Sequence, residues 1–168
     1  MLNADTQYYI SLVETTAQRY LPFGRFVHGF VRGKLLHDPV YRAILEMNLL
    51  PEQGKILDLG CGRGILLSLL TTWRHLNKQV SAGLVFNGIE LRSQDAKTAQ
   101  AVLGLDAEIA NADIRSAILA DCQVVILLDV LLYLREPEQA AVLQRIAKAL
   151  PVNGTLIMRE ADASAGFW

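Results

Sequence analysis

The sequence contains only two cysteines, Cys61 and Cys122, and it lacks a basic segment followed by an apolar stretch and a small-residue cleavage site. Two cysteines are too few for the disulfide framework that stabilises small secreted domains. Long apolar runs are also absent: the run from Val124 to Leu128 ends at the charged Asp129, far short of a membrane-spanning helix. We therefore expect a cytoplasmic protein with reduced cysteines that does not cross a membrane.

Neither sign of charge predominates, because 16 Lys and Arg residues face 17 Asp and Glu residues, and no strip rich in Lys or Arg is present. This balance argues against nucleic-acid binding, which requires a basic surface. The three histidines, His28, His37 and His75, are not spaced as metal ligands are, and no cysteine pair accompanies them. The sequence therefore predicts no metal site.

Residues 1–50 form a helical cap in our interpretation, within the same domain as the rest of the 168 residues. Their apolar positions recur at helical spacing, which indicates two or three helices. Leu21-Pro22 should interrupt the first helix, and Asp38-Pro39 should begin another that ends near Met47. Seven aromatic residues fall in this segment: Tyr8, Tyr9, Tyr20, Phe23, Phe26, Phe30 and Tyr41.

Basic residues outnumber acidic ones between Arg19 and Arg42, where only Asp38 is acidic. They are spread over the expected helices and do not form a block, so a solvated helix face is the simpler interpretation. The alternative is a docking surface for an anionic acceptor or an acidic carrier protein.

Residues 51–168 alternate short apolar runs with amphipathic stretches, the pattern of an α/β fold. Such alternation predicts a doubly wound, mainly parallel sheet whose strands all end at one edge, where a ligand would bind. The expected strands are Ile56–Leu59, Val85–Ile89, Ala107–Ala110, Val124–Leu128 and Thr155–Arg159, and the expected helices are Gly64–His75, Gln94–Leu103 and Glu136–Leu150.

A glycine-rich stretch, KILDLGCGRGILL from Lys55 to Leu67, follows the first expected strand. Its three glycines let the backbone turn tightly and bring a ligand against the amides of a helix N-terminus. The spacing is Gly-x-Gly-x-Gly, whereas the dinucleotide fingerprint requires a glycine at the position of Ile65. The stretch also lacks the Lys-Ser/Thr ending of a P-loop, which argues against phosphoryl transfer.

The segment from Asp58 to Gly64 resembles motif I of the class I S-adenosylmethionine-dependent methyltransferases. Further segments follow in that family's order: GIEL with Glu90, NADI with Asp113, and VVILLDVLLYL with Asp129. The resemblance covers residues 52–160 and implies a Rossmann-like fold of about five strands here, with S-adenosylmethionine as the cofactor.

The family's residue roles can be carried onto these positions. The resemblance implies that the loop backbone contacts the methionyl group and that Asp58 orders the loop or reaches the methionyl amine, directly or through water. Glu90 would accept both ribose hydroxyls and Leu91 would follow it against the cofactor, while Asp113 would bind the adenine amino group and Ile114 the ring. The implied cofactor-binding set is Asp58, Gly60, Cys61, Gly62, Gly64, Glu90, Leu91, Asp113, Ile114 and Asp129.

Each charged member of this set also has a purely structural interpretation. Glu90 alone could be a solvated acid at a strand end, and Asp113 alone could be a turn residue or a helix N-cap. Asp129 could cap the turn that leads to Tyr133, and this role and an active-site role are equally compatible with the sequence. The Cys61 thiol lies at a helix N-terminus, where a nucleophile must be considered, but no histidine accompanies it in the sequence.

The resemblance implies methyl transfer to a small-molecule acceptor through oxygen, nitrogen or carbon, with positioning as the main catalytic device. Asp129 and Tyr133 are the candidate catalytic residues, because Leu132 stands where some relatives have a histidine. Part of the aromatic residues of the cap should line a lid over the cofactor. The alternatives are a non-catalytic subunit that binds S-adenosylmethionine and, less favoured by the loop spacing, a nicotinamide-dependent oxidoreductase.

The sequence ends soon after the fifth expected strand. Members of the family usually add two strands after the fifth, whereas this sequence stops at Trp168, shortly after Arg159. We therefore expect either a C-terminally truncated piece of a longer protein or a homodimer that covers the exposed sheet edge.

Overall fold

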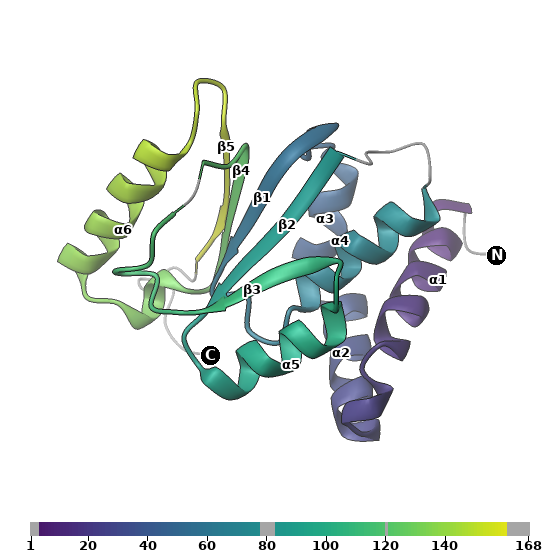
Figure 1. The fold of residues 1–168 in the computed structure, drawn as a ribbon. Helices are drawn as coiled ribbons and strands as arrows, with labels where there is room; N and C mark the ends of the chain where they lie inside the picture. The colour runs from purple at the N-terminus through teal and green to yellow at the C-terminus, as the bar shows by residue number, and fades with distance from the viewer. Residues whose placement is uncertain (1–3, 78–82, 120, 161–168) are drawn as a thin grey trace, which may run out of the picture.

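Five parallel strands form the sheet of this protein, whose computed structural model describes residues 4–77, 83–119 and 121–160 (Figure 1). Their order is β3-β2-β1-β4-β5, so β1 lies at the centre and the chain winds outward from it on both sides. The expected doubly wound fold is confirmed. The strands are β1 (Gln53–Leu59), β2 (Gly83–Glu90), β3 (Ala107–Asn111), β4 (Val124–Leu128) and β5 (Thr155–Arg159).

Successive residues of a strand point to opposite faces of the sheet, and each face carries its own core. Ile56 packs in the core on the side of α4 (Ile65–Leu76) and α5 (Ser93–Leu103). Its neighbour Leu57 packs in the other core, on the side of α6 (Glu136–Ala149). Figure 1 shows the two groups of helices on opposite sides of the sheet. The near-continuous apolar run of β4 follows from this, because both of its faces are covered.

The N-terminal segment folds as expected into helices, and it packs on the same side of the sheet as α4 and α5. The chain breaks at Leu21-Pro22, where the 3-10 helix η1 forms. Asp38 caps the next helix, because its Oδ1 accepts a hydrogen bond from the backbone N–H of Val40 at 3.2 Å. The elements are α1 (Ala4–Gln18), η1 (Leu21–Phe23), α2 (Arg25–His37) and α3 (Pro39–Glu46).

Two side chains at the end of α1 attach this segment to the rest of the protein. The Arg19 guanidinium donates to Thr71 Oγ1 at 2.8 Å, to the Val102 carbonyl at 3.0 Å and to Asp106 Oδ2 at 2.8 Å. The buried Tyr20 hydroxyl donates to the carbonyl of Arg63, inside the glycine loop, at 3.0 Å. The helical cap therefore supports the loop from behind.

β5 lies at one edge of the sheet, and its side chains Leu156 and Met158 are 37% and 49% exposed. The expected homodimer would have to cover this edge. The end of the chain, residues 161–168, to which the expectation of a truncated piece refers, lies outside the described residues. Within the described ranges, no helix combines the length and the apolar composition needed to cross a membrane.

Candidate functional site

The loop between β1 and α4, residues 60–64, turns through three left-handed backbone positions: Gly60 at φ 75°, Gly62 at 55° and Gly64 at 72°. The amides of Gly60 and Cys61 both donate to the carbonyl of Ile89, at 2.8 and 3.1 Å, and so attach the loop to the end of β2. A Cβ atom at Gly60 would lie 2.5 Å from Val130 Cγ2. The glycine at this position is therefore required both by the backbone conformation and by the close approach of the segment after β4.

Glu90 lies at the end of β2 and is only 6% exposed. Its Oε2 accepts a hydrogen bond from the backbone amide of Gly62 at 2.9 Å, and its Oε1 accepts one from the amide of Arg92 at 2.7 Å. A carboxylate offers about four acceptor positions, so two further hydrogen bonds remain available. The interpretation of Glu90 as a solvated acid is therefore wrong.

A first cavity of about 530 Å³ opens beside Glu90, and we call it the Glu90 cavity. It brings together residues that the sequence spreads over four strand ends. Its lining includes Gly60, Gly62, Glu90, Leu91, Asp113, Ile114, Asp129 and Tyr133.

A second cavity, of about 630 Å³, lies on the side of α2, and we call it the α2 cavity. Gly60, Gly62, Asp129 and Tyr133 line both cavities, so the two meet across the glycine loop. Gly64 lines neither of them; a Cβ there would lie 3.0 Å from Leu103 and 3.1 Å from Ala99, so it lets α4 and α5 pack closely. The α2 cavity also contains Phe26, Phe30, Lys34, Tyr41, Asp58, Cys61, Arg63 and Arg159.

Asp58 is 4% exposed and lines the α2 cavity. Among the described residues its carboxylate has no hydrogen-bond or ion-pair partner. Burial, together with the nearby Glu90 carboxylate, raises the pKa of Asp58 from 3.8 to about 7. A buried acid without a cationic partner is costly, and it is a favourable position for a positively charged ligand group.

Asp113 follows β3 in a turn and forms ion pairs with Arg115, Nη2 to Oδ2 at 2.6 Å. Its Oδ1 also accepts from the backbone amide of Arg115 at 2.9 Å, so the turn interpretation is confirmed. Hydrogen bonds from the Arg115 side chain lower the pKa of Asp113. Arg115 also forms an ion pair with Glu138 on α6, with Nη1 3.0 Å from Oε1. These ion pairs hold the wall of the Glu90 cavity next to Ile114 in place.

Asp129 follows β4 with a left-handed backbone, φ 56°, which is uncommon outside glycine. Its carboxylate forms an ion pair with Arg159 at the end of β5, and Arg159 forms another with Asp38 at the start of α3. Asp129 does not cap the following turn: the Glu160 carboxylate accepts from the amides of Val130 and Leu131, at 3.0 and 2.8 Å. The capping interpretation of Asp129 is therefore wrong, and its side chain faces the two cavities.

Cys61 is 8% exposed, and burial together with the carboxylates of Asp58 and Glu90 raises the pKa of its thiol. A thiol in this environment is a poor nucleophile. Over the ranges that the structure describes, no group of three or more His, Cys, Asp or Glu side chains is arranged to hold a metal ion.

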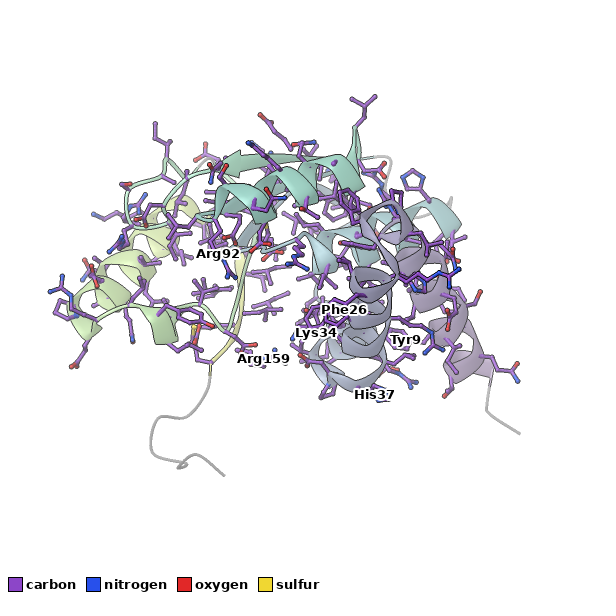
Figure 2. The ribbon with its side chains drawn as sticks, turned by 90° about the horizontal axis from the view of Figure 1, so that it is seen from below. Tyr9, Phe26, Lys34, His37, Arg92 and Arg159 are labelled. Carbon is purple, nitrogen blue, oxygen red and sulfur yellow. The ribbon has the colours of Figure 1, made fainter. Side chains whose placement is uncertain are left out.

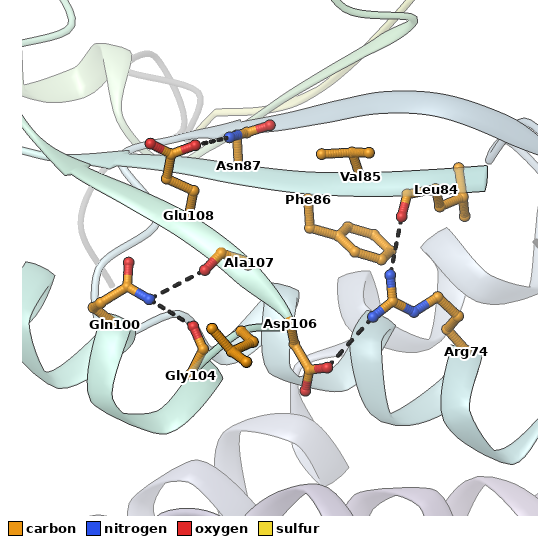
Figure 3. A pocket seen from close by; sticks show the side chains of 11 residues that line it. Arg74, Leu84, Val85, Phe86, Asn87, Gln100, Gly104, Asp106, Ala107 and Glu108 are labelled. Carbon is orange, nitrogen blue, oxygen red and sulfur yellow. Dashed lines mark hydrogen bonds and ion pairs between the residues drawn. The ribbon is translucent and has the colours of Figure 1, made fainter. Parts of the chain in front are cut away.

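A further cavity of about 410 Å³ contains none of the expected site residues and lies beside the first residues of β2 and β3 (Figure 3). The Asp106 carboxylate lies at this cavity, and its Oδ1 is 3.4 Å from Arg74 Nη2 and 2.8 Å from His75 Nε2. The Arg74 guanidinium also lies over the ring of Phe86, 5.2 Å from its centre. Because these groups bind one another and join α4 to the turn before β3, we regard this cavity as structural.

The expected site residues did not include Lys34, Arg63 and Arg159, which line the α2 cavity, or Asp38, which pairs with Lys34 and Arg159. Figure 2 labels Lys34 and Arg159. Arg159 could have been found, because it ends the fifth expected strand and parallel strands end at one edge. Lys34 was indicated only as one of the basic residues between Arg19 and Arg42. Asp38 gave no signal for its pairing with Arg159, since the two are 121 residues apart in the chain.

A family model described as a methyltransferase domain matches residues 30–167. The carboxy-S-adenosyl-L-methionine synthase of Campylobacter concisus (strain 13826) is 30% identical over 121 residues, which are 70% of this chain and 49% of that protein. The chain thus spans about half the length of this curated relative.

Solved structures show the same fold. A coclaurine N-methyltransferase bound to N-methylheliamine and S-adenosylhomocysteine matches with a TM-score of 0.59 and 15% identity, over 73% of this chain and 35% of that one. A TehB-like S-adenosylmethionine-dependent methyltransferase from Corynebacterium glutamicum ATCC 13032 matches with a TM-score of 0.54 and 24% identity, over 70% of this chain and 59% of that one.

Proposed function

The chain belongs to the class I S-adenosylmethionine-dependent methyltransferases, and from this premise we propose that it methylates a small molecule held in the α2 cavity. The observation that carries the proposal is the junction of the two cavities at Gly60, Gly62 and Asp129. A cofactor that extends from the Glu90 cavity across this junction to the inner wall of the α2 cavity can present its reactive methyl group to a molecule in the rest of the α2 cavity.

The donor and acceptor groups of the Glu90 cavity fit the nucleoside part of S-adenosylmethionine. Glu90 has two free acceptor positions for the ribose hydroxyls, and Leu91 and Ile114 offer apolar surface on either side of the base. We assign Asp113 to the adenine amino group. Gly62 supports the fit, because a Cβ there would meet no atom within 4 Å and the space above it is open.

The α2 cavity fits the methionyl part at its inner wall. Asp58 offers a buried carboxylate to the ammonium group, and Arg63 offers guanidinium nitrogens to the carboxylate, because only its Nε is bound, to Asp95 at 2.9 Å. Cys61 contributes its backbone to this wall, and Gly64 acts through helix packing, without lining the cavity.

When bound, S-adenosylmethionine supplies a methyl group on a positively charged sulfur, which leaves as a neutral thioether as the acceptor's electron pair bonds to the methyl carbon. The protein's part is to hold the acceptor in line and to exclude water. Asp129 and Tyr133 line both cavities, and we assign them as the residues that contact the acceptor. The Asp129 carboxylate is placed to take up a proton from an acceptor that must lose one.

A small molecule fits the site better than a carrier protein does. The basic residues of the cap that suggested a carrier are largely paired: Arg19 with Asp106, Arg32 with Glu14 and Arg42 with Glu46. This pairing argues against a docking surface for an acidic carrier protein on the cap. We also propose that residues 1–50 act as a cap on the 51–168 core within one domain, in the cytoplasm.

The experiment is transfer of radiolabelled methyl groups from S-adenosylmethionine to a small-molecule extract of cells, separated by chromatography. The protein should label at least one metabolite. Asp129→Asn should lower the label by roughly tenfold or more, and Tyr133→Phe should lower it less. Asp121→Asn and Tyr8→Phe, which lie outside both cavities, are the matched controls. An unlabelled extract despite tight binding of S-adenosylhomocysteine would favour the non-catalytic alternative.

A further inference from the structure

One face of α2 carries Phe26, Phe30 and Lys34 at intervals of four residues, so the three side chains form one row along the helix. All three line the α2 cavity. Phe26 is 86% exposed and Phe30 is 50% exposed, which is unusual for two adjacent large apolar side chains on one helix face. The row is apolar at one end and cationic at the other, and Figure 2 shows Phe26 and Lys34 on the side of α2 that faces Arg159.

Two cations converge at the polar end of this row. Lys34 Nζ lies 3.1 Å from Asp38 Oδ2, and Arg159 Nη2 lies 3.0 Å from the same oxygen. Hydrogen bonds from Arg159, then those from Lys34 and the Val40 amide, outweigh partial burial and lower the pKa of Asp38 to about 2.

These cations keep unused donors. Among the described residues Lys34 donates one hydrogen bond, to Asp38, and its ammonium group also lies 5.7 Å from the centre of the Tyr41 ring. Arg159 uses its Nε hydrogen, one hydrogen of Nη1 and both hydrogens of Nη2. Two N–H groups of Lys34 and one of Arg159 therefore remain for a further anionic oxygen.

We propose that Lys34 and Arg159 form a carboxylate-binding subsite of the α2 cavity, so that the methyl acceptor is a small carboxylic acid whose apolar body packs on Phe26 and Phe30. This inference rests on the proposed function and names the class of its substrate. The acceptor's carboxylate would anchor it at the end of β5, and its body would extend along the aromatic row.

The cofactor's own carboxylate is the other possible occupant of a cationic subsite, and the geometry separates the two. Arg63 belongs to the glycine loop and has unbound guanidinium nitrogens beside it. Lys34 and Arg159 come instead from α2 and the end of β5, next to Asp129, the residue assigned to the acceptor. The cofactor therefore has a carboxylate partner of its own.

The test is calorimetric titration of three acid and amide pairs into the protein saturated with S-adenosylhomocysteine: benzoate and benzamide, 3-phenylpropionate and 3-phenylpropionamide, octanoate and octanamide. Each pair differs mainly in charge. For at least one pair, the wild-type protein should bind the acid at least tenfold more tightly than the amide. Lys34→Met should reduce this ratio to about one and Lys34→Arg should restore most of it.

Arg32→Met is the matched control, because it removes the same charge from α2 at a side chain that pairs with Glu14 and does not line the cavity. It should leave the ratio unchanged. The affinity for S-adenosylhomocysteine, measured in the same samples, should be equal in wild type, Lys34→Met and Arg32→Met, which also shows that each variant is folded.

Three results would overturn the inference: equal binding of acid and amide in all pairs, equal effects of Lys34→Met and Arg32→Met, or loss of S-adenosylhomocysteine binding in Lys34→Met alone. The last result would assign the subsite to the cofactor. Wild-type protein that fails to bind S-adenosylhomocysteine would instead contradict the proposed function itself.

Discussion

The carboxylate of Glu90, at the end of β2, accepts a hydrogen bond from the backbone amide of Gly62 in the glycine loop at 2.9 Å. One buried side chain therefore shapes the loop and faces the cavity in which we place the ribose. This contact links the conformation of the loop to cofactor binding.

Glu90→Ala should weaken S-adenosylhomocysteine binding at least tenfold. The change removes two charge-assisted hydrogen bonds to the ribose, each worth about 1.5–3 kcal/mol, and releases the Gly62 amide. Calorimetry measures the affinity, and Glu108→Ala on β3, outside both site cavities, is the control. If Glu90→Ala bound like wild type, the ribose assignment would be wrong.

Gly62→Ala and Gly104→Ala form a useful pair, because both glycines have a positive φ, 55° and 57°, and neither Cβ would meet an atom within 4 Å. Gly62→Ala should cost about 1–2 kcal/mol of stability from its positive φ. Gly104→Ala should cost at least as much, because its ψ of −119° lies outside the left-handed helical region. Only the Gly62 methyl group would enter the space of the cofactor, so only Gly62→Ala should lose affinity for S-adenosylhomocysteine. Thermal unfolding and calorimetry check this, and equal affinities would contradict it.

Asp58→Asn should stabilise the free protein more at pH 8 than at pH 5. The folded-state pKa of about 7 lies above the ordinary value of 3.8, so the stability associated with the bound proton is complete below pH 3.8 and is lost progressively between pH 3.8 and pH 7. Asparagine removes that loss, so its stabilising effect should be larger at pH 8 than at pH 5 by on the order of 2 kcal/mol, or roughly 4–8 °C in melting temperature. Melting curves that shift equally at both pH values would contradict the pKa assigned to Asp58.

The same carboxyl group makes cofactor binding dependent on pH. An ammonium group binds the ionised form of Asp58, so the affinity of the wild-type protein for S-adenosylhomocysteine should rise by about fivefold to tenfold from pH 6 to pH 8. In Asp58→Asn the affinity should be lower and nearly constant over this range. A pH dependence that survives the substitution would show that another group is responsible.

Asp113→Ala should weaken S-adenosylhomocysteine binding less than Glu90→Ala does, by about 1 kcal/mol, because the adenine amino group has to share both carboxylate oxygens with the Arg115 amide and guanidinium, which donate four hydrogen bonds to them. Asp113→Ala should also reduce the preference for S-adenosylhomocysteine over S-inosylhomocysteine, because S-inosylhomocysteine has a carbonyl oxygen in place of the adenine amino group that Asp113 would bind. Asp121→Ala is an exposed control. Equal losses for the two ligands would mean that Asp113 acts only in the turn.

The positions of the strands, their parallel arrangement and the glycine loop were predictable because they depend on local signals. Alternating apolar runs and a strand that ends in three glycines determine where the chain turns, and parallel strands then bring Glu90, Asp113 and Asp129 to one edge. The predicted bounds of β4 and β5 match the structure, and β1 starts three residues earlier than Ile56, at Gln53.

The ionic contacts of the site were not predictable in the same way. Asp38 was predicted to cap a helix, and the structure confirms this. Its ion pair with Arg159 was not predictable, because it depends on how α2 and α3 pack against the sheet. The burial of Asp58 without a cationic partner among the described residues could not be predicted from the sequence either, because burial is a property of the folded chain. Tertiary packing divides the aromatic residues of the cap: Tyr9 and Tyr20 are buried, Tyr41 is buried and also lines the α2 cavity, and Phe26 and Phe30 are exposed and line the same cavity.

A pair of calorimetric titrations of the wild-type protein, one with S-adenosylhomocysteine and one with NAD, tests the identity of the cofactor. S-adenosylhomocysteine should bind at one site per chain and NAD should give no saturable heat, since the loop lacks the glycine that the pyrophosphate requires. Binding of NAD without binding of S-adenosylhomocysteine would contradict this assignment of the cofactor.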